Sequence, residues 1–190
     1  FPSLRQFSRD IPVIMAKNTS DLLVGRGWNE IHELDWGETL AIKEVTIEAL
    51  RVNHFGWRFP WERDRSRGDW NGRSFNAYML SKNGRNIVFG GDTAYQEYFK
   101  ALAERGLPIE LAILPIGAYN PWIRAHANPE QAVAMANHMR AKAILPIHWN
   151  TFTLSYEPQP EPIARLKQAL EQHSPRLALE NTGETWTLTS

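Results

Sequence analysis

The chain has 190 residues, of which 43% are hydrophobic and 11% aromatic, and its formal net charge is zero. This is enough material for one domain with an apolar core, and the balanced charge excludes a strong overall field that would attract nucleic acid. There is no cysteine, which excludes disulfides and thiolate metal sites, so a metal would need His, Asp or Glu ligands.

The first part of the chain is predicted to consist mainly of strands. Runs and alternations of apolar residues indicate strands at 11–16, 29–34, 39–42 and 45–52, with short helices near 1–10 and 18–23. The strand at 45–52 runs directly into Asn53 and His54, which places an imidazole at its end.

Residues 55–73 show no periodicity and combine three tryptophans with five arginines. A stretch of this length without secondary structure is either a functional loop or a disordered one. Arginine suits phosphate, and tryptophan suits an acyl chain or a membrane interface. The alternative is a solvated loop whose charge is partly offset by Glu62, Asp64 and Asp69.

The rest of the chain is predicted to alternate between strands and helices. Strands are expected at 74–81, 86–90, 109–114 and 143–147, and helices at 94–105, from Asn128 onward and at 162–172. Asn83-Gly84 is expected to form a hairpin turn, and short strands at 177–179 and 185–188 to close the domain. This order predicts an α/β layered domain in which helices cover a sheet.

Three residues with metal-binding chemistry come at the ends of predicted strands: His54, Asp92 and His148. Sites collect at the carboxyl ends of strands in layered α/β sheets, and two imidazoles with a carboxylate can bind Zn²⁺, Fe²⁺ or Mn²⁺. His126, in the irregular stretch at 115–128, is a candidate fourth member. The alternative for Asp92 is a cap of the helix expected from Ala94. The other histidines, which we expect to be structural or surface residues, are His32, His138 and His173.

Several short motifs occur in one order along the chain, within a region from residue 12 to the C-terminus. They are Val52-Asn53-His54, Gly91-Asp92-Thr93-Ala94-Tyr95, Leu114-Pro115-Ile116-Gly117-Ala118-Tyr119, His126-Ala127-Asn128-Pro129-Glu130-Gln131-Ala132, Ile147-His148-Trp149-Asn150-Thr151-Phe152, Glu157-Pro158 and Glu161-Pro162. Together they resemble the metallo-β-lactamase superfamily, and most closely the branch of N-acyl-phosphatidylethanolamine-hydrolysing phospholipases D and their bacterial relatives.

This resemblance implies an α/β fold, the metallo-β-lactamase-like αββα sandwich, with residues 1–190 forming the C-terminal part of a single domain. The His-x-His-x-Asp-His motif of the family does not occur in this sequence. The N-terminal layer is therefore expected to be missing here and to be supplied by a longer chain or by another chain.

The resemblance also implies roles for individual residues. Two divalent metal ions are expected, zinc first, with iron or manganese as alternatives. His54 would bind one metal, His148 the other, and Asp92 would bridge them as a catalytic ligand, while His126 would lie beside the site as a catalytic residue that contacts substrate phosphate. The residues expected to bind substrate are Trp57, Arg58, Tyr119 and Trp149.

The function implied is that of a metal-dependent hydrolase, most closely a phosphodiesterase of the phospholipase D type that uses a hydroxide activated by two metals. The alternatives are a lactonase or other hydrolase on the same fold, or a non-catalytic half-domain that binds a partner. Phe55 and Asn150 depart from the pattern of the phospholipases, which leaves the substrate open between a small phosphodiester and a lipid-like molecule.

The same reasoning gives expectations for partners and location. We expect contact with the missing N-terminal half or with another chain, and no binding of nucleic acid. Peripheral membrane contact and homo-oligomer formation are open alternatives. The expected location is cytoplasmic or at the membrane periphery. The chain starts at Phe1 without a methionine, so a targeting signal cannot be judged. The isolated chain is expected to be inactive, to bind zinc weakly and to expose an apolar patch.

Overall fold

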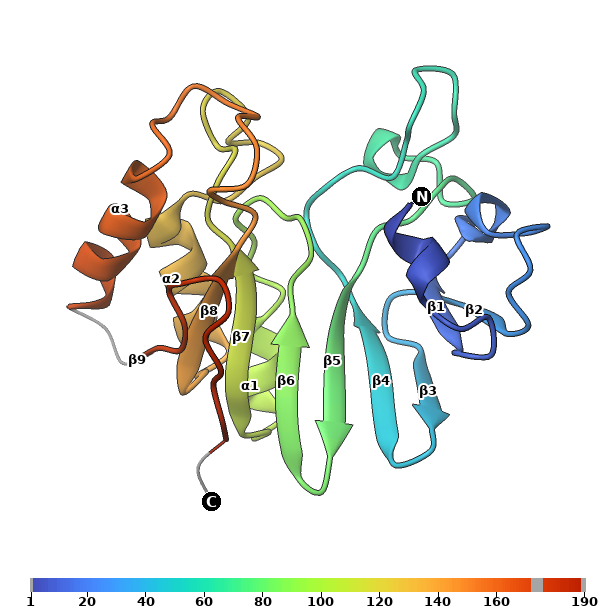
Figure 1. Cartoon of the computed structure of the whole chain (residues 1–190), viewed down its shortest axis with the longest axis horizontal. Helices are drawn as coiled ribbons and strands as arrows, with labels where there is room; N and C mark the ends of the chain where they lie inside the picture. Colours follow the sequence, from blue (N-terminus) through green and yellow to red (C-terminus); the bar gives the residue numbers. More distant parts are fainter. Residues whose placement is uncertain (1, 172–175, 189–190) are drawn as a thin grey trace.

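The structure is a computed structural model that describes residues 2–171 and 176–188. Within these ranges the chain forms a seven-stranded sheet in the order β3-β4-β5-β6-β7-β8-β9 and a separate two-stranded sheet of β1 and β2 (Figure 1). The strands are β1 (Val13–Ala16), β2 (Ile31–Leu34), β3 (Thr39–Ile42), β4 (Val45–Leu50), β5 (Ala77–Lys82), β6 (Arg85–Phe89), β7 (Ile109–Pro115), β8 (Ala143–Ile147) and β9 (Arg176–Leu177).

The helices follow the strands of the second half. They are α1 (Lys100–Glu104), α2 (Pro129–His138) and α3 (Glu161–Leu170), and three short 3₁₀ turns lie at Ser3–Gln6, Ser20–Leu22 and Arg65–Arg67. The start of α2 is the predicted one: the side chain of Asn128 accepts the N–H of Gln131, and the Gln131 side chain accepts the N–H of Asn128. This reciprocal capping box satisfies two N–H groups that the helix itself leaves unpaired.

The large sheet changes character at β6. Strands β3 to β6 pair antiparallel, and β5 and β6 are joined by the predicted hairpin turn, in which Asn83 and Gly84 both have positive φ. Strands β6 to β9 pair parallel, and α1, α2 and α3 lie on the connections between them. The predicted α/β layered domain is therefore confirmed.

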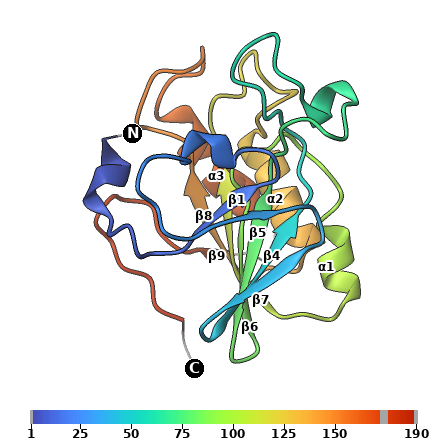
Figure 2. The same cartoon turned by 90° about the vertical axis from the view of Figure 1, so that its right-hand side faces the viewer.

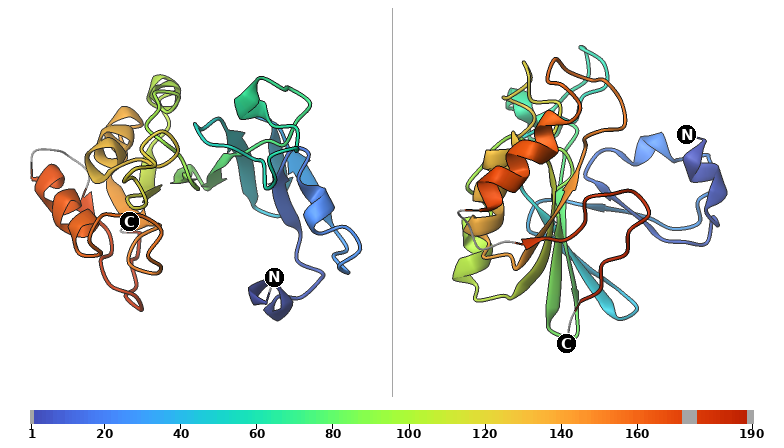
Figure 3. Two further views of the ribbon diagram at one scale, coloured as in Figure 1. Left: turned by 90° about the horizontal axis from the view of Figure 1, so that it is seen from above. Right: turned by 60° about the vertical axis from the view of Figure 1, so that its left-hand side comes forward.

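The three α-helices lie on one face of the large sheet, as the views in Figures 2 and 3 show. The core between them is made of fully buried apolar side chains from β6, β7, β8, α2 and α3, among them Val88, Leu114, Ile144, Met135 and Leu166. Because β7 and β8 are apolar on both faces, they have the composition of buried parallel strands.

The opposite face of the sheet is apolar but only partly covered. The β1–β2 sheet and the segment 178–188 lie on this side (Figure 3, right), while Leu80 and Phe89 remain 37% and 40% exposed. A groove of about 920 Å³ runs between the two sheets, lined by apolar residues such as Ile14, Val45 and Ile47 and by charged ones such as Glu30 and Lys82. Exposed apolar side chains therefore lie on this face, and whether they drive association stays a prediction.

Two predicted elements are wrong. The helix expected at 94–105 begins only at Lys100, since the carbonyl of Ala94, which would accept the N–H of Tyr98 in a helix, accepts the hydroxyl of Thr93 instead. The strand expected at 185–188 does not form, and just before it the carboxylate of Glu184 accepts the N–H groups of Glu180 and Asn181 in a turn.

Some predictions lie outside the described residues. The predicted end of the helix at Gln172 and the environment of His173 are among them. Within the described ranges, no helix is both long enough and apolar enough to cross a membrane.

Candidate metal centre

Four predicted side chains come together at one edge of the large sheet. His54 follows β4, Asp92 follows β6, His126 lies on the connection between β7 and α2, and His148 follows β8. Strands β4, β6, β7 and β8 all point the same way, because β4 and β6 are each antiparallel to β5, and β6, β7 and β8 are parallel. Their carboxyl ends therefore meet at the edge drawn uppermost in Figure 1.

The distances within this group are close to those of a metal site. Ligand atoms of His54, Asp92 and His126 all lie within 4.8 Å of one another, and Nε2 of His148 is 3.6 Å from Oδ1 of Asp92. The ring of His126 is 5.2 Å from that of His54 and 5.0 Å from that of His148. The single carboxylate thus lies among three imidazoles, which is where a ligand shared between two metals would be.

The nitrogen atoms of the cluster fit a metal. His54 Nδ1 lies 3.0 Å from the carbonyl oxygen of Phe55, which can only accept, so Nδ1 carries the proton and Nε2 keeps its lone pair. Nε2 of His54, Nδ1 of His126 and Nδ1 of His148 are buried and have no hydrogen-bond partner among the described residues. Buried polar atoms are rarely left unpaired, so these atoms are suited to a bound ion.

The charge state of His126 agrees with this arrangement. Burial, followed by the neighbouring imidazoles of His54 and His148, lowers the pKa of His126 to about 4. The ring is therefore neutral at pH 7 and offers a lone pair rather than a second proton.

The chain reaches His148 through an unusual backbone path. His148 has a φ of 60°, a left-handed conformation that costs energy for a residue with a side chain. A Cβ at Gly117 would lie only 2.3 Å from the carbonyl oxygen of His148, so a residue with a side chain does not fit there. The N–H of Ile116 also donates to the carbonyl of Ile147. Gly117 therefore allows the turn that aims His148 at the site, and only its place in the motif Leu-Pro-Ile-Gly could have indicated this from sequence.

The loop at 55–73 is ordered by its own arginines. Four of them have partners within the protein: Arg63 with Asp69, Arg65 with Asp35, Arg67 with the carbonyl of Pro60, and Arg73 with Asp21 and Glu62. Among the described residues, Arg58 is the one arginine of this loop whose guanidinium lacks an oxygen partner, and it lies 5.7 Å from the ring centre of Phe59. Most of the basic charge is therefore structural.

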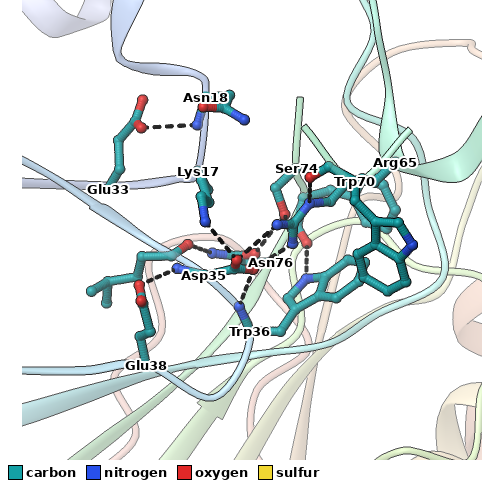
Figure 4. A network of polar contacts seen from close by, with 12 residues as sticks. Lys17, Asn18, Glu33, Asp35, Trp36, Glu38, Arg65, Trp70, Ser74 and Asn76 are labelled. Atoms are coloured by element: carbon teal, nitrogen blue, oxygen red, sulfur yellow. Dashed lines mark hydrogen bonds and ion pairs between the residues drawn. The ribbon is translucent and has the colours of Figure 1, made fainter. Parts of the chain in front are cut away.

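The contact between Arg65 and Asp35 is the centre of this order (Figure 4). The guanidinium of Arg65 bonds both carboxylate oxygens of Asp35, and Lys17 adds an ion pair of 3.0 Å to the same carboxylate. Arg65 also lies 4.7 Å from the ring centre of Trp36, whose indole N–H donates to the carbonyl of Phe75. The Arg65 guanidinium holds the pKa of Asp35 well below its usual range, so this pair remains charged at neutral pH.

Asp64 anchors the same loop behind His54. Its carboxylate is fully buried and accepts the N–H groups of Gly56 and Ser66 as well as the hydroxyl of Ser66. Because Gly56 comes two residues after His54, this carboxylate fixes the path by which the chain leaves the site.

The four residues predicted to bind substrate differ in their surroundings. Trp57 stacks on Phe55, which in turn stacks on His54, with ring centres 5.0 and 4.3 Å apart. Arg58 is described above as the arginine without an oxygen partner. Trp149 lines a cavity of about 450 Å³ together with His148 and residues 179–184. These three placements are compatible with substrate contact, which stays a prediction.

Tyr119 has a different environment. It is only 6% exposed, and its hydroxyl donates to Glu161. Burial and the hydrogen bond to Glu161 raise its pKa above the usual value. Glu161 also pairs with Arg165 of α3, so Tyr119 ties the His126 connection to that helix. These contacts give Tyr119 a role in supporting the loop, and its predicted contact with substrate stays a prediction.

Histidines and a carboxylate gathered at the carboxyl edge of a helix-covered sheet define a protein of the metallo-hydrolase class. The chain belongs to the metallo-β-lactamase superfamily: the family model described as the beta-lactamase superfamily domain matches residues 1–149. The fold implies divalent metal ions, and the cluster around Asp92 could hold them.

Curated relatives agree with the family. The chain is 33% identical over 180 residues to an N-acyl-phosphatidylethanolamine-hydrolyzing phospholipase D of Caenorhabditis elegans, with 90% of this chain and 48% of that protein covered. It is 32% identical over 167 residues to an uncharacterized protein of Mycobacterium tuberculosis, with 84% and 43% covered. The chain therefore spans less than half the length of these relatives.

Solved structures show the same fold. Igni18, a metallo hydrolase from Ignicoccus hospitalis, matches with a TM-score of 0.68 and 17% identity, and 94% of this chain and 69% of that one are covered. An isothiocyanate hydrolase from Delia radicum gut bacteria matches with a TM-score of 0.71 and 15% identity, with 99% and 71% covered.

Proposed function

We propose that this chain provides half of the active site of a metal-dependent hydrolase, most closely a phosphodiesterase of the phospholipase D type. The observation that carries the proposal is the convergence of His54, Asp92, His126 and His148 at one sheet edge. Asp92 is the one carboxylate among these four side chains, and the other three are imidazoles.

Each residue has a task in this proposal. His54 and His148 would each help to hold a divalent ion, and the carboxylate of Asp92 would be available to both. Metals held in this way supply a Lewis acid and activate water at neutral pH. His126, neutral and partly buried, is placed to accept a hydrogen bond from substrate or to add a ligand. Zinc suits these nitrogen and oxygen donors, and iron or manganese are the alternatives.

The ligand set of this chain is incomplete for two metals. Zinc sites normally use at least three protein ligands for each ion, whereas four side chains here would serve two. We propose that further ligands come from a segment or chain that covers the open apolar face of the sheet. The 190 residues alone would then bind zinc weakly and lack hydrolytic activity.

The proposed substrate is a small or lipid-like phosphodiester. The likeness to the phospholipase of Caenorhabditis elegans supports this choice, as do the aromatic stack at Trp57 and the available guanidinium of Arg58. Trp61 and Trp70, both largely exposed, support a peripheral contact of the same loop with a membrane. The open sheet face would also allow two copies to associate.

Removing one ligand is expected to weaken metal binding sharply. His148→Ala should lower the affinity of the chain for Zn²⁺ at least about tenfold, because the substitution removes a nitrogen donor that no neighbour replaces. Isothermal titration with zinc chloride measures this directly. His32→Ala is the matched control, since His32 lies in β2 and contacts Glu30 instead of the cluster. Equal affinities for the two variants would contradict the proposed centre.

The substrate class requires the longer protein. A chain extended to the length of the relatives should bind two zinc ions and hydrolyse phosphodiesters faster than lactones or amides in a substrate panel. Preferential cleavage of a lactone would replace the phosphodiesterase by a lactonase. Tight metal binding without any hydrolysis would favour the non-catalytic binding module.

Arg58 and Arg63 provide a test of the role of the loop in the same longer protein. Arg58→Ala should raise KM several-fold for an anionic substrate and leave KM for a neutral substrate unchanged, because it removes an available positive charge. Arg63→Ala is the control, since its guanidinium is already paired with Asp69. The result that counts against the electrostatic role is an equal change in KM for both substrates or for both variants.

A further inference from the structure

The polypeptide segments that carry His54, Asp92 and His126 are joined at a single buried residue, Thr93. Thr93 has no exposed surface. It follows Asp92 directly, and its hydrogen bonds go to Asn53, Ala94 and Ala127. Two of these partners are the immediate neighbours of His54 and His126.

The hydroxyl of Thr93 makes the link to His54. It accepts the N–H of Asn53 at 3.1 Å and donates to the carbonyl of Ala94 at 2.8 Å. The N–H of Ala94 in turn donates to the carbonyl of Asn53 at 2.8 Å, which closes a ring between the two segments. A serine or threonine hydroxyl can donate one hydrogen bond and accept two, so the Thr93 hydroxyl can bond the Asn53 N–H and the Ala94 carbonyl at the same time.

The backbone of Thr93 makes the link to His126. Its carbonyl accepts the N–H of Ala127 at 2.8 Å, and Ala127 is itself fully buried. His148 is not part of this connection, since its turn is held against Gly117 and Ile116 instead. The cluster therefore has two supports: Thr93 for three of its members, and Gly117 for the fourth.

We propose that Thr93 is the positioning residue of the candidate metal centre: its hydroxyl fixes His54 relative to Asp92, and its carbonyl fixes His126. This inference rests on the part of the proposed function that has these side chains bind a metal. It does not depend on the substrate. A threonine just before a helix commonly caps it, but α1 begins only at Lys100. The Thr93 hydroxyl is therefore not used as a helix cap and instead links the two segments.

The test compares Thr93→Val with Thr93→Ser in the full chain. Valine keeps the branched shape but leaves the part-buried N–H of Asn53 without its acceptor, whereas serine keeps the hydroxyl and loses the methyl group. Zinc is titrated as zinc chloride while the imidazole signals of His54, His126 and His148 are followed by NMR. We expect Thr93→Val to weaken the zinc response of His54 about tenfold or more, as loss of an outer partner of a metal ligand does, and Thr93→Ser to retain it.

A second measurement separates this inference from the proposed function. In the metal-free chain, Thr93→Val should abolish the hydrogen-exchange protection of the Asn53 amide, and Thr93→Ser should preserve it. Should the wild-type histidines not respond to zinc, the proposed metal centre fails, while the exchange result still decides whether Thr93 holds the segments. If Thr93→Val does not fold, Thr93→Ala is used instead. Alanine also removes the hydroxyl, but it does not add the extra methyl group of valine to a buried position.

The inference is overturned by either of two results. One is a wild-type zinc response of His54 in Thr93→Val. The other is a loss in Thr93→Ser as large as in the valine variant, because a role limited to packing would follow the methyl group and the stability of the fold.

Discussion

Gly117→Ala is expected to disable the His148 side of the metal centre. A Cβ at this position would lie 2.3 Å from the carbonyl oxygen of His148 and 3.2 Å from the Cβ of Trp149. The first of these is a backbone atom, which cannot move without shifting the turn at His148. We expect the affinity for zinc to fall about a hundredfold and the free energy of unfolding to fall by about 2–4 kcal/mol.

The measurements for this variant are zinc titration and chemical denaturation. Gly106→Ala is the control, because Gly106 lies after α1 with open space around it, so a Cβ there meets no neighbour and only its positive φ opposes the substitution. That substitution should cost about 1–2 kcal/mol from backbone strain and leave zinc binding unchanged. An unchanged NMR signal for the imidazole of His148 in Gly117→Ala would show that the turn does not depend on this glycine.

Asp64→Ala is expected to release the loop at 55–73 from the site. The substitution empties a fully buried carboxylate position and leaves the part-buried N–H groups of Gly56 and Ser66 without an acceptor. Buried donors without partners are costly, so we expect a loss of about 2–4 kcal/mol in the free energy of unfolding. For a chain of this length, Tm should fall by about 5–15 °C, which differential scanning calorimetry measures.

The matched control for Asp64 is Asp69, a carboxylate of the same loop. Asp69 is partly exposed and pairs with Arg63, which is itself exposed. Surface ion pairs contribute little to stability, so Asp69→Ala should have nearly the Tm of the wild type. Similar melting temperatures for Asp64→Ala and Asp69→Ala would mean that the buried carboxylate does not organise the loop.

Much of the fold could be predicted from local sequence patterns. The strands from 39–42 to 143–147 and the start of α2 at Asn128-Pro129 were indicated by apolar runs, alternation and capping residues, and the structure has them. The predicted helix from Ala94 failed because Thr93 and Ala94 form a bonded ring with Asn53, which lies far away in the sequence. Local preference carries no information on such a contact.

The candidate site shows the same division. The positions of His54, Asp92 and His148 at strand ends indicated a shared edge, because parallel strands finish together. The loop arginines were misleading as a group, since their number suggests an anion site, whereas most of them are paired with carboxylates such as Asp35 and Asp21. Pairings of this kind depend on the tertiary arrangement, so only the structure could separate Arg58 from the others.

The change from antiparallel to parallel pairing at β6 has a consequence for the order of folding. Hairpins join β3 to β4 and β5 to β6, whereas the pairs β4–β5, β6–β7 and β7–β8 form only after longer connections have been closed. Contacts between distant segments form more slowly than local ones. His54 belongs to the first half and His148 to the second, so their cluster cannot exist until both halves have joined. A metal in the surrounding medium then finds its ligands only in the finished fold, and it stabilises that state by mass action rather than guiding the chain towards it.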